Sequence, residues 1–237
     1  MTDTGSFFAS IAIGALAAFL LLRARDDSSG PRWLSRGFAA LCMADALVGL
    51  FGVIAVTLHL SPSAAFYRAM IGGTVAVGQV IAGFAVGAAV APLVGRRPEG
   101  ARIAASAEPA WVTIGLAWYV ALSFAGFEIG KAAHDTQMRQ FFLGSGYTVA
   151  FMYAVMVLEI IGAAGLLVAR LRTAAAVLLG ALMLGAIATH ARNGDPVTDS
   201  LDAVRMLLLV ASVALLDRFR RGARPRGGAL SNAYVDK

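Results

Sequence analysis

The sequence has few of the residues from which redox and metal centres are built. Its 237 residues include one cysteine, Cys42, and three histidines, His59, His134 and His190. A single cysteine excludes an intramolecular disulfide and a thiol relay within the chain. The histidines belong to different segments and lack the spacing of zinc or haem ligands, so we predict no metal site.

Motifs for nucleotide and nucleic-acid binding are also missing. There is neither a Gly-x-Gly-x-x-Gly fingerprint nor a Walker lysine, so nucleotide binding has no support. The net charge of +6 comes from basic residues that flank apolar stretches, without an RNA- or DNA-binding motif. We therefore expect contacts with anionic lipid and no nucleic-acid partner.

Charged residues are scarce, whereas apolar residues dominate. Only 14% of the residues are charged and 59% are hydrophobic, which disfavours a soluble globular domain. Most of the apolar stretches are long enough to cross about 30 Å of hydrocarbon as a helix. Backbone polar groups in lipid must be paired internally, so we predict an all-α polytopic membrane bundle. The seven predicted spans are 7–22, 37–60, 69–94, 110–127, 147–169, 174–191 and 201–216.

Lysine and arginine are distributed unevenly between the two sides of these spans. Fifteen of them fall on alternate connections and the C-terminal tail, and five on the opposite side. The positive-inside rule places the N-terminus outside and the C-terminus in the cytoplasm. Seven helices in this orientation suggest a retinal protein, but residues 201–216 contain no lysine for a Schiff base. We therefore expect no retinal.

The polar connection at residues 95–109 divides the chain. We expect a three-helix N-terminal membrane part at 1–97, a four-helix bundle at 110–216 and a basic cytoplasmic tail at 217–237. Gly83 with Gly87, and Gly126 with Gly130, have the Gly-xxx-Gly spacing that lets two membrane helices approach closely.

Polar residues inside the predicted spans are costly, because a charge at the bilayer centre costs roughly 2.5–3.5 kcal/mol. Glu159 is flanked on both sides by apolar residues and needs a cation or a proton. Asp45, in the second span, is better explained by a structural role. Two pairs three residues apart, Glu128 with Lys131 and Asp202 with Arg205, fit ordinary ion pairs on helix surfaces.

We predict a polar pocket toward the outer half of the membrane. Its candidate residues are Glu159, His190, Lys131, Glu128 and His134. The alternative is that Glu159 is a hydrogen-bonded residue of helix packing and that His190 caps its helix.

Four short motifs follow one another in the second half of the chain, including a basic turn between two predicted helices. They are Gly126 to Lys131 (GFEIGK), Val157 to Leu167 (VLEIIGAAGLL), Arg170 to Ala175 (RLRTAA) and Met183 to His190 (MLGAIATH). In these motifs and their order, residues from about 110 to 216 resemble the DoxX-like family of small integral membrane proteins. The three N-terminal spans lie outside the resemblance.

The resemblance implies a role rather than a reaction. Family members look like subunits of quinone-linked sulfur oxidation in archaea and of thiol-redox complexes at bacterial membranes. The family's buried acid corresponds to Glu159, its helix-ending histidine to His190 and its glycine-lysine step to Lys131. We therefore expect a multi-pass protein of a bacterial plasma membrane that binds a quinone or another lipid-soluble molecule and supports a partner redox enzyme.

Two other functions stay open at this point. The chain fits a non-catalytic scaffold within a larger complex, since glycine and alanine are abundant on its spans. It also fits a stand-alone lipid-modifying enzyme that uses a carboxylate and a histidine as acid and base. No redox centre lies in the sequence, so a redox function needs electrons from another chain.

Overall fold

The protein is all-helical in the part of the chain that the computed structural model describes, residues 4–23, 32–58, 64–94 and 108–222. Within these ranges there are eight helices and no strand. The helices are α1 Thr4–Arg23, α2 Arg32–Thr57, α3 Ala64–Val94, α4 Glu108–Ala133, α5 Asp135–Gly144, α6 Val149–Leu167, α7 Arg172–Asn193 and α8 Val197–Gly222.

Five helices are long and apolar enough to cross a membrane, judged by length and composition. They contain the stretches Ser35–Thr57, Gly72–Val90, Ala110–Ala133, Val149–Leu167 and Arg172–Asn193. In α1 the apolar stretch Thr4–Ala18 is shorter. The eighth helix, the longer counterpart of the predicted span 201–216, is not among the five and carries charged residues toward both of its ends. The helices thus support a multi-pass membrane protein. They do not confirm the predicted number of seven spans.

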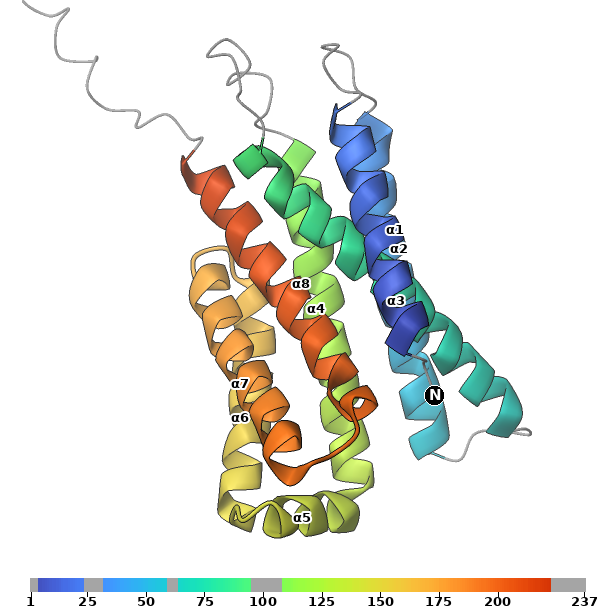
Figure 1. The fold of residues 1–237 in the computed structure, drawn as a ribbon, viewed down its shortest axis with the longest axis vertical. Helices are drawn as coiled ribbons and strands as arrows, with labels where there is room; N and C mark the ends of the chain where they lie inside the picture. The colour runs from blue at the N-terminus through green and yellow to red at the C-terminus, as the bar shows by residue number, and fades with distance from the viewer. Residues whose placement is uncertain (1–3, 24–31, 59–63, 95–107, 223–237) are drawn as a thin grey trace, which may run out of the picture.

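The helices form two groups that lie side by side (Figure 1). Helices α1, α2 and α3 make one group, and α4, α6, α7 and α8 make the other. The groups meet where α2 packs along α4 and where α3 crosses α8. The C-terminal ends of α1, α3 and α8 lie toward the same end of the molecule as the starts of α2 and α4 (Figure 1). The predicted alternation of helix direction is therefore present in the fold.

Close approach of α1 and α3 depends on glycine. A Cβ at Gly83 would overlap the backbone of Ile11, and one at Gly87 would lie 2.6 Å from the Ala15 carbonyl oxygen. Gly14 has the same role on α1, since its Cβ would lie 2.8 Å from the Phe84 nitrogen. The predicted close contact at Gly83 and Gly87 is thus confirmed.

The second predicted glycine contact is absent. A Cβ at Gly126 would meet side chains no closer than 3.9 Å, and one at Gly130 would meet nothing within 4 Å. The approach of α2 to α4 occurs instead at Gly115, where a Cβ would lie 2.7 Å from the Ala39 Cα. A Gly-xxx-Gly spacing shows that close packing is sterically allowed, whereas the neighbouring helix decides where it happens.

Helix α5 is an element that the sequence reading missed. None of its ten residues is buried, and its apolar run, Phe141 to Leu143, is too short to indicate a membrane span. It connects the end of α4 to α6 across one end of the bundle (Figure 1). Helix α6 then begins after Thr148, whose hydroxyl accepts a hydrogen bond from the Phe151 nitrogen at 3.1 Å and so caps the helix.

At the other end of the bundle, Asp217 ties α8 to the turn between α6 and α7. Its carboxylate accepts hydrogen bonds from Thr173 at 2.9 Å and Arg221 at 2.6 Å, and lies 3.5 Å from Arg172. Arg172 is itself buried and donates to the Leu166 carbonyl oxygen at 2.9 Å. Residues 217–222, which we expected in the tail, therefore continue α8, and residues 223–237 lie outside the described part.

Candidate functional site

Three of the five predicted pocket residues form one buried ion cluster. The Lys131 ammonium group donates to Glu128 Oε1 at 2.7 Å and to Glu159 Oε2 in a second ion pair. Glu128 and Glu159 are 6% and 4% exposed. The second Glu128 oxygen, Oε2, has no hydrogen-bond partner among the described residues. This cluster, which we call the acid–lysine triad, connects the end of α4 to the middle of α6.

The triad is placed by ordinary helix geometry. Glu128 and Lys131 are three residues apart and share one face near the end of α4. Glu159 reaches the same lysine because α6 packs along α4. The predicted pair of Glu128 with Lys131 is confirmed. Of the two possibilities expected for Glu159, a cation as partner or a proton, the structure has the ion pair with Lys131.

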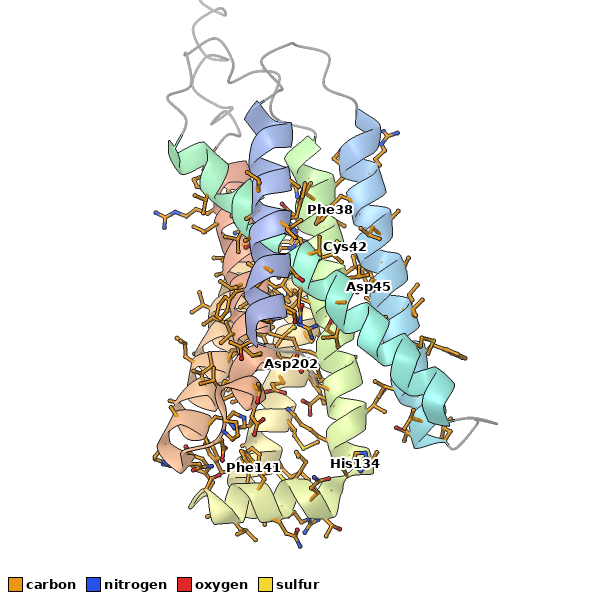
Figure 2. All side chains as sticks on the ribbon, turned by 45° about the vertical axis from the view of Figure 1, so that its right-hand side comes forward. Phe38, Cys42, Asp45, His134, Phe141 and Asp202 are labelled. Atoms are coloured by element: carbon orange, nitrogen blue, oxygen red, sulfur yellow. The ribbon has the colours of Figure 1, made fainter. Side chains whose placement is uncertain are left out.

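His190 and His134 have other neighbours. The His190 Nδ1 lies 2.8 Å from the Asp195 carboxylate, and its ring packs against Phe141 with centroids 5.4 Å apart. His134 is exposed at the start of α5. Figure 2 shows His134 and Phe141 at different positions along α5, and seven helical residues span about 10 Å. Whether either histidine shares a pocket with Glu159 stays a prediction.

A polar corner joins the end of α7 to the turn between α5 and α6. The Tyr147 hydroxyl lies 3.0 Å from that of Thr189, and the Asn193 amide donates to the Ser145 hydroxyl at 2.7 Å. Arg192 donates to the Ser145 carbonyl oxygen and stacks over the Tyr147 ring at 4.9 Å. These contacts hold the end of α7, and with it His190, against the turn between α5 and α6.

On the surface of α5 an ion pair forms beside Tyr153. Arg139 donates to Asp135 at 2.6 Å and to the Tyr153 hydroxyl at 2.5 Å. The hydrogen bond to Asp135 raises the pKa of the Arg139 guanidinium above its usual value. The pair is exposed to solvent, so it fixes the orientation of α5 more than it stabilises the fold.

Sequence reasoning missed a second polar cluster, near the middle of the molecule. Asp45 on α2, Tyr119 on α4 and Arg205 on α8 are all buried, and the Asp45 carboxyl interacts with both the Tyr119 hydroxyl and the Arg205 charge. Figure 2 shows Asp45 midway along α2, with Cys42 one turn away. Each polar residue was visible in the sequence, but no spacing rule joins residues from three separate helices.

The described surface also has a broad groove between α2 and α4. It has a volume of about 590 Å³, and the small residues Ala39, Ala40 and Gly115 are part of its lining. Trp111 and Trp118 lie along it, and the Arg36 guanidinium stacks over Trp111 at 5.9 Å. Arginine and tryptophan together are typical of the region where a membrane protein meets lipid head groups.

The triad is suited to holding and exchanging a proton. Two carboxylates facing one ammonium group would carry a net negative charge if all three were ionised, and such a charge is costly away from water. One proton on the pair of carboxyls removes that charge. Among the described residues no group of three histidine, cysteine, aspartate or glutamate side chains is arranged to hold a metal ion.

Fold and site together define the class of this molecule: an all-α, multi-pass integral membrane protein with a buried acid–lysine triad. Residues 115–214 match the model of the DoxX-like family. The match runs from α4 into α8, which confirms the resemblance seen in the sequence, and α1 to α3 form an additional N-terminal part outside it. No curated protein and no solved structure matches the chain.

Proposed function

We propose that this protein binds a quinone or another lipid-soluble molecule with a polar head at the acid–lysine triad, as the membrane subunit of a partner redox enzyme. The observation that carries the proposal is Lys131 paired with two buried carboxylates from two helices. Reduction of a quinone takes up two electrons and two protons. A carboxyl that shares a proton inside the membrane is a suitable donor for one of those protons.

The electrons in this proposal come from another chain. The sequence contains no motif for haem, an iron–sulfur cluster or a dinucleotide, so the chain supplies binding and protons while its partner supplies the electrons. The match of residues 115–214 to the DoxX-like family supports this role through what the resemblance implies.

We further propose seven membrane spans in the plasma membrane of a bacterium, with the N-terminus outside. In this arrangement α1 and α8 cross the bilayer together with the five apolar helices, and α5 lies at the outer interface. The bias of arginine toward alternate connections supports the orientation. The triad then lies in the outer half of the bilayer, because Lys131 is near the outer end of α4.

The test of the proton role is Glu159→Gln, which keeps the size and hydrogen-bonding capacity of the side chain and removes its charge. Protein in nanodiscs would be titrated with decylubiquinone, with binding followed by tryptophan fluorescence and carboxyl protonation by infrared difference spectroscopy. We expect the wild type to bind and to show a carboxyl signal that Glu159→Gln loses.

Asp195→Asn is the matched control, because it alters an acid that pairs with His190 instead of Lys131. It should keep the carboxyl signal. Absence of decylubiquinone binding by the wild type, or an identical infrared signal in Glu159→Gln, would refute the site. Mild-detergent isolation followed by mass spectrometry tests the partner separately, and a co-purifying flavin or haem subunit is the expected result.

A scaffold is the second candidate, favoured by the outer faces of α6 and α7. They expose large aliphatic side chains, including Ile160, Ile161 and Val177, which are 54%, 55% and 64% exposed. Such faces suit either lipid or the helices of another membrane protein. If the scaffold function holds, partner proteins co-purify while decylubiquinone neither binds nor changes the infrared spectrum.

A further inference from the structure

A small cavity lies at the boundary between the N-terminal helices and the DoxX-like segment. Its volume is about 100 Å³, and helices α2, α3, α4 and α8 all contribute to its wall. The lining residues that the argument uses are Asp45, Tyr119, Arg205, Gly126, Leu50 and Leu122. None of them belongs to the acid–lysine triad.

The wall of the cavity includes an arginine with an unused donor. Arg205 is 5% exposed, and its Nη2 lies 3.1 Å from the Asp202 carboxylate in an ion pair. Its Nε is buried and has no hydrogen-bond partner in the described part of the chain. A buried donor left unpaired is costly, and the cost is higher for a charged group. The cavity is therefore built around a donor that an oxygen atom would satisfy.

Gly78 on α3 leaves space beside the guanidinium group of Arg205. A Cβ at Gly78 would overlap the Tyr119 hydroxyl and lie 3.1 Å from Arg205 Nη1. Polar atoms of α4 and α8 therefore lie together where α3 has no side chain.

The outer part of the cavity is apolar and open toward the membrane. Leu50 and Leu122 line it and are partly exposed, whereas Asp45, Tyr119 and Arg205 are buried. A molecule that enters from the lipid therefore meets aliphatic side chains first and the polar group last. A hydrocarbon chain with an oxygen at its end matches this order.

We propose that this cavity binds the neutral carbonyl or hydroxyl oxygen at the end of an apolar molecule, with Arg205 Nε as the donor. Two acidic groups face the arginine, Asp45 from α2 and Asp202 from its own helix, so an anionic ligand would be repelled. Drug-sized ligands fill roughly 300–1,000 Å³, so only the polar end of the molecule fits and its tail lies in the lipid between α2 and α4.

The test uses a long-chain methyl ketone that carries a diazirine beside its carbonyl group, added to the full-length protein in nanodiscs. Irradiation followed by peptide mass spectrometry maps the labelled residues. We expect labelling at Leu50 and Leu122, with a diazirine hydrocarbon of equal length labelling these sites about tenfold less. Arg205→Lys keeps the charge beside Asp202 but removes Nε, and should also lower labelling by the ketone about tenfold.

Three further variants distinguish this site from its alternatives. Gly126→Leu places bulk in the cavity and should abolish labelling, whereas Gly185→Leu adds the same bulk on α7 where no atom lies within 4 Å and should not. Glu159→Gln should leave labelling unchanged, because Glu159 does not line this cavity. The proposal for this cavity and the proposal for the triad can therefore be refuted independently. Equal labelling by ketone and hydrocarbon, or full labelling of Arg205→Lys, would mean that Arg205 Nε does not recognise the oxygen and would overturn the proposal.

Discussion

Lys131 forms ion pairs with two buried carboxylates of the DoxX-like segment, Glu128 and Glu159. It is the shared ion-pair partner of these carboxylates, which α4 and α6 bring into the interior, and it is itself only partly exposed. Removing one partner of a buried ion pair leaves an uncompensated charge, which costs far more than the pair contributes. Replacing Lys131 should therefore affect both the stability of the fold and the proposed proton exchange.

We expect Lys131→Met to lower the free energy of unfolding by about 3 kcal/mol, the lower end of the range for breaking a buried pair, because the lysine is partly exposed. Thermal unfolding in mild detergent measures the effect. Adding Glu159→Gln to Lys131→Met should recover part of the loss, since one stranded carboxylate is then neutral.

The control for that experiment is Asp135→Asn, which breaks the exposed pair with Arg139 on α5. Its unfolding midpoint should match the wild type. If Lys131→Met and Asp135→Asn unfold at the same temperature, the triad does not stabilise the protein as its burial implies.

At the scale of elements, glycine decides which helices touch. Gly83 and Gly87 allow the backbone of α3 to lie against that of α1, and Gly115 allows α4 to approach α2. Gly126 and Gly130 have the same sequence spacing and no backbone neighbour at that range. The spacing therefore marks a surface on which close packing is allowed, and contact requires a second small residue on the facing helix.

Gly83→Ala and Gly130→Ala form a matched pair that tests this difference. The first places a Cβ into the backbone of Ile11, so we expect a lower unfolding midpoint and faster proteolysis of α1. The second meets open space, and the loss of a helical glycine should leave stability unchanged or raise it by up to about 1 kcal/mol. Equal effects of the two substitutions would rule out the close contact between α1 and α3.

At the scale of the whole molecule, the arrangement of helix ends agrees with the distribution of arginine. The connections that carry most basic residues start and finish at helix ends on one side of the bundle, and α5 lies on the other side (Figure 1). This agreement supports the proposed orientation, in which the basic side is cytoplasmic.

Single-cysteine labelling tests the orientation directly. Cys42 is fully buried, so Cys42→Ala gives a background without native thiols. In intact cells a membrane-impermeant thiol reagent should label Gln137→Cys on α5 and spare Glu99→Cys in the connection between α3 and α4. Breaking the cells should expose Glu99→Cys, and the reverse pattern would invert the proposed topology.

The sequence alone determined the membrane class, the approximate helices, the alternation of helix direction and the resemblance to the DoxX-like family, because apolar length and the placement of arginine are local properties. It also identified Glu128 with Lys131, since residues three apart on a helix are neighbours by geometry. It failed at α5, whose apolar run of three residues is too short to mark a span, and at some helix ends, which lie up to six residues from the predicted limits.

Only the tertiary structure decided which polar residues from different helices meet. Glu159 shares Lys131 with Glu128, whereas His190 pairs with Asp195 and Asp45 joins Tyr119 and Arg205. A residue's position along a helix fixes its depth and its direction from the helix axis. The neighbour that it meets depends on how the helices are rotated and packed, and that is set by contacts between small residues far apart in the sequence.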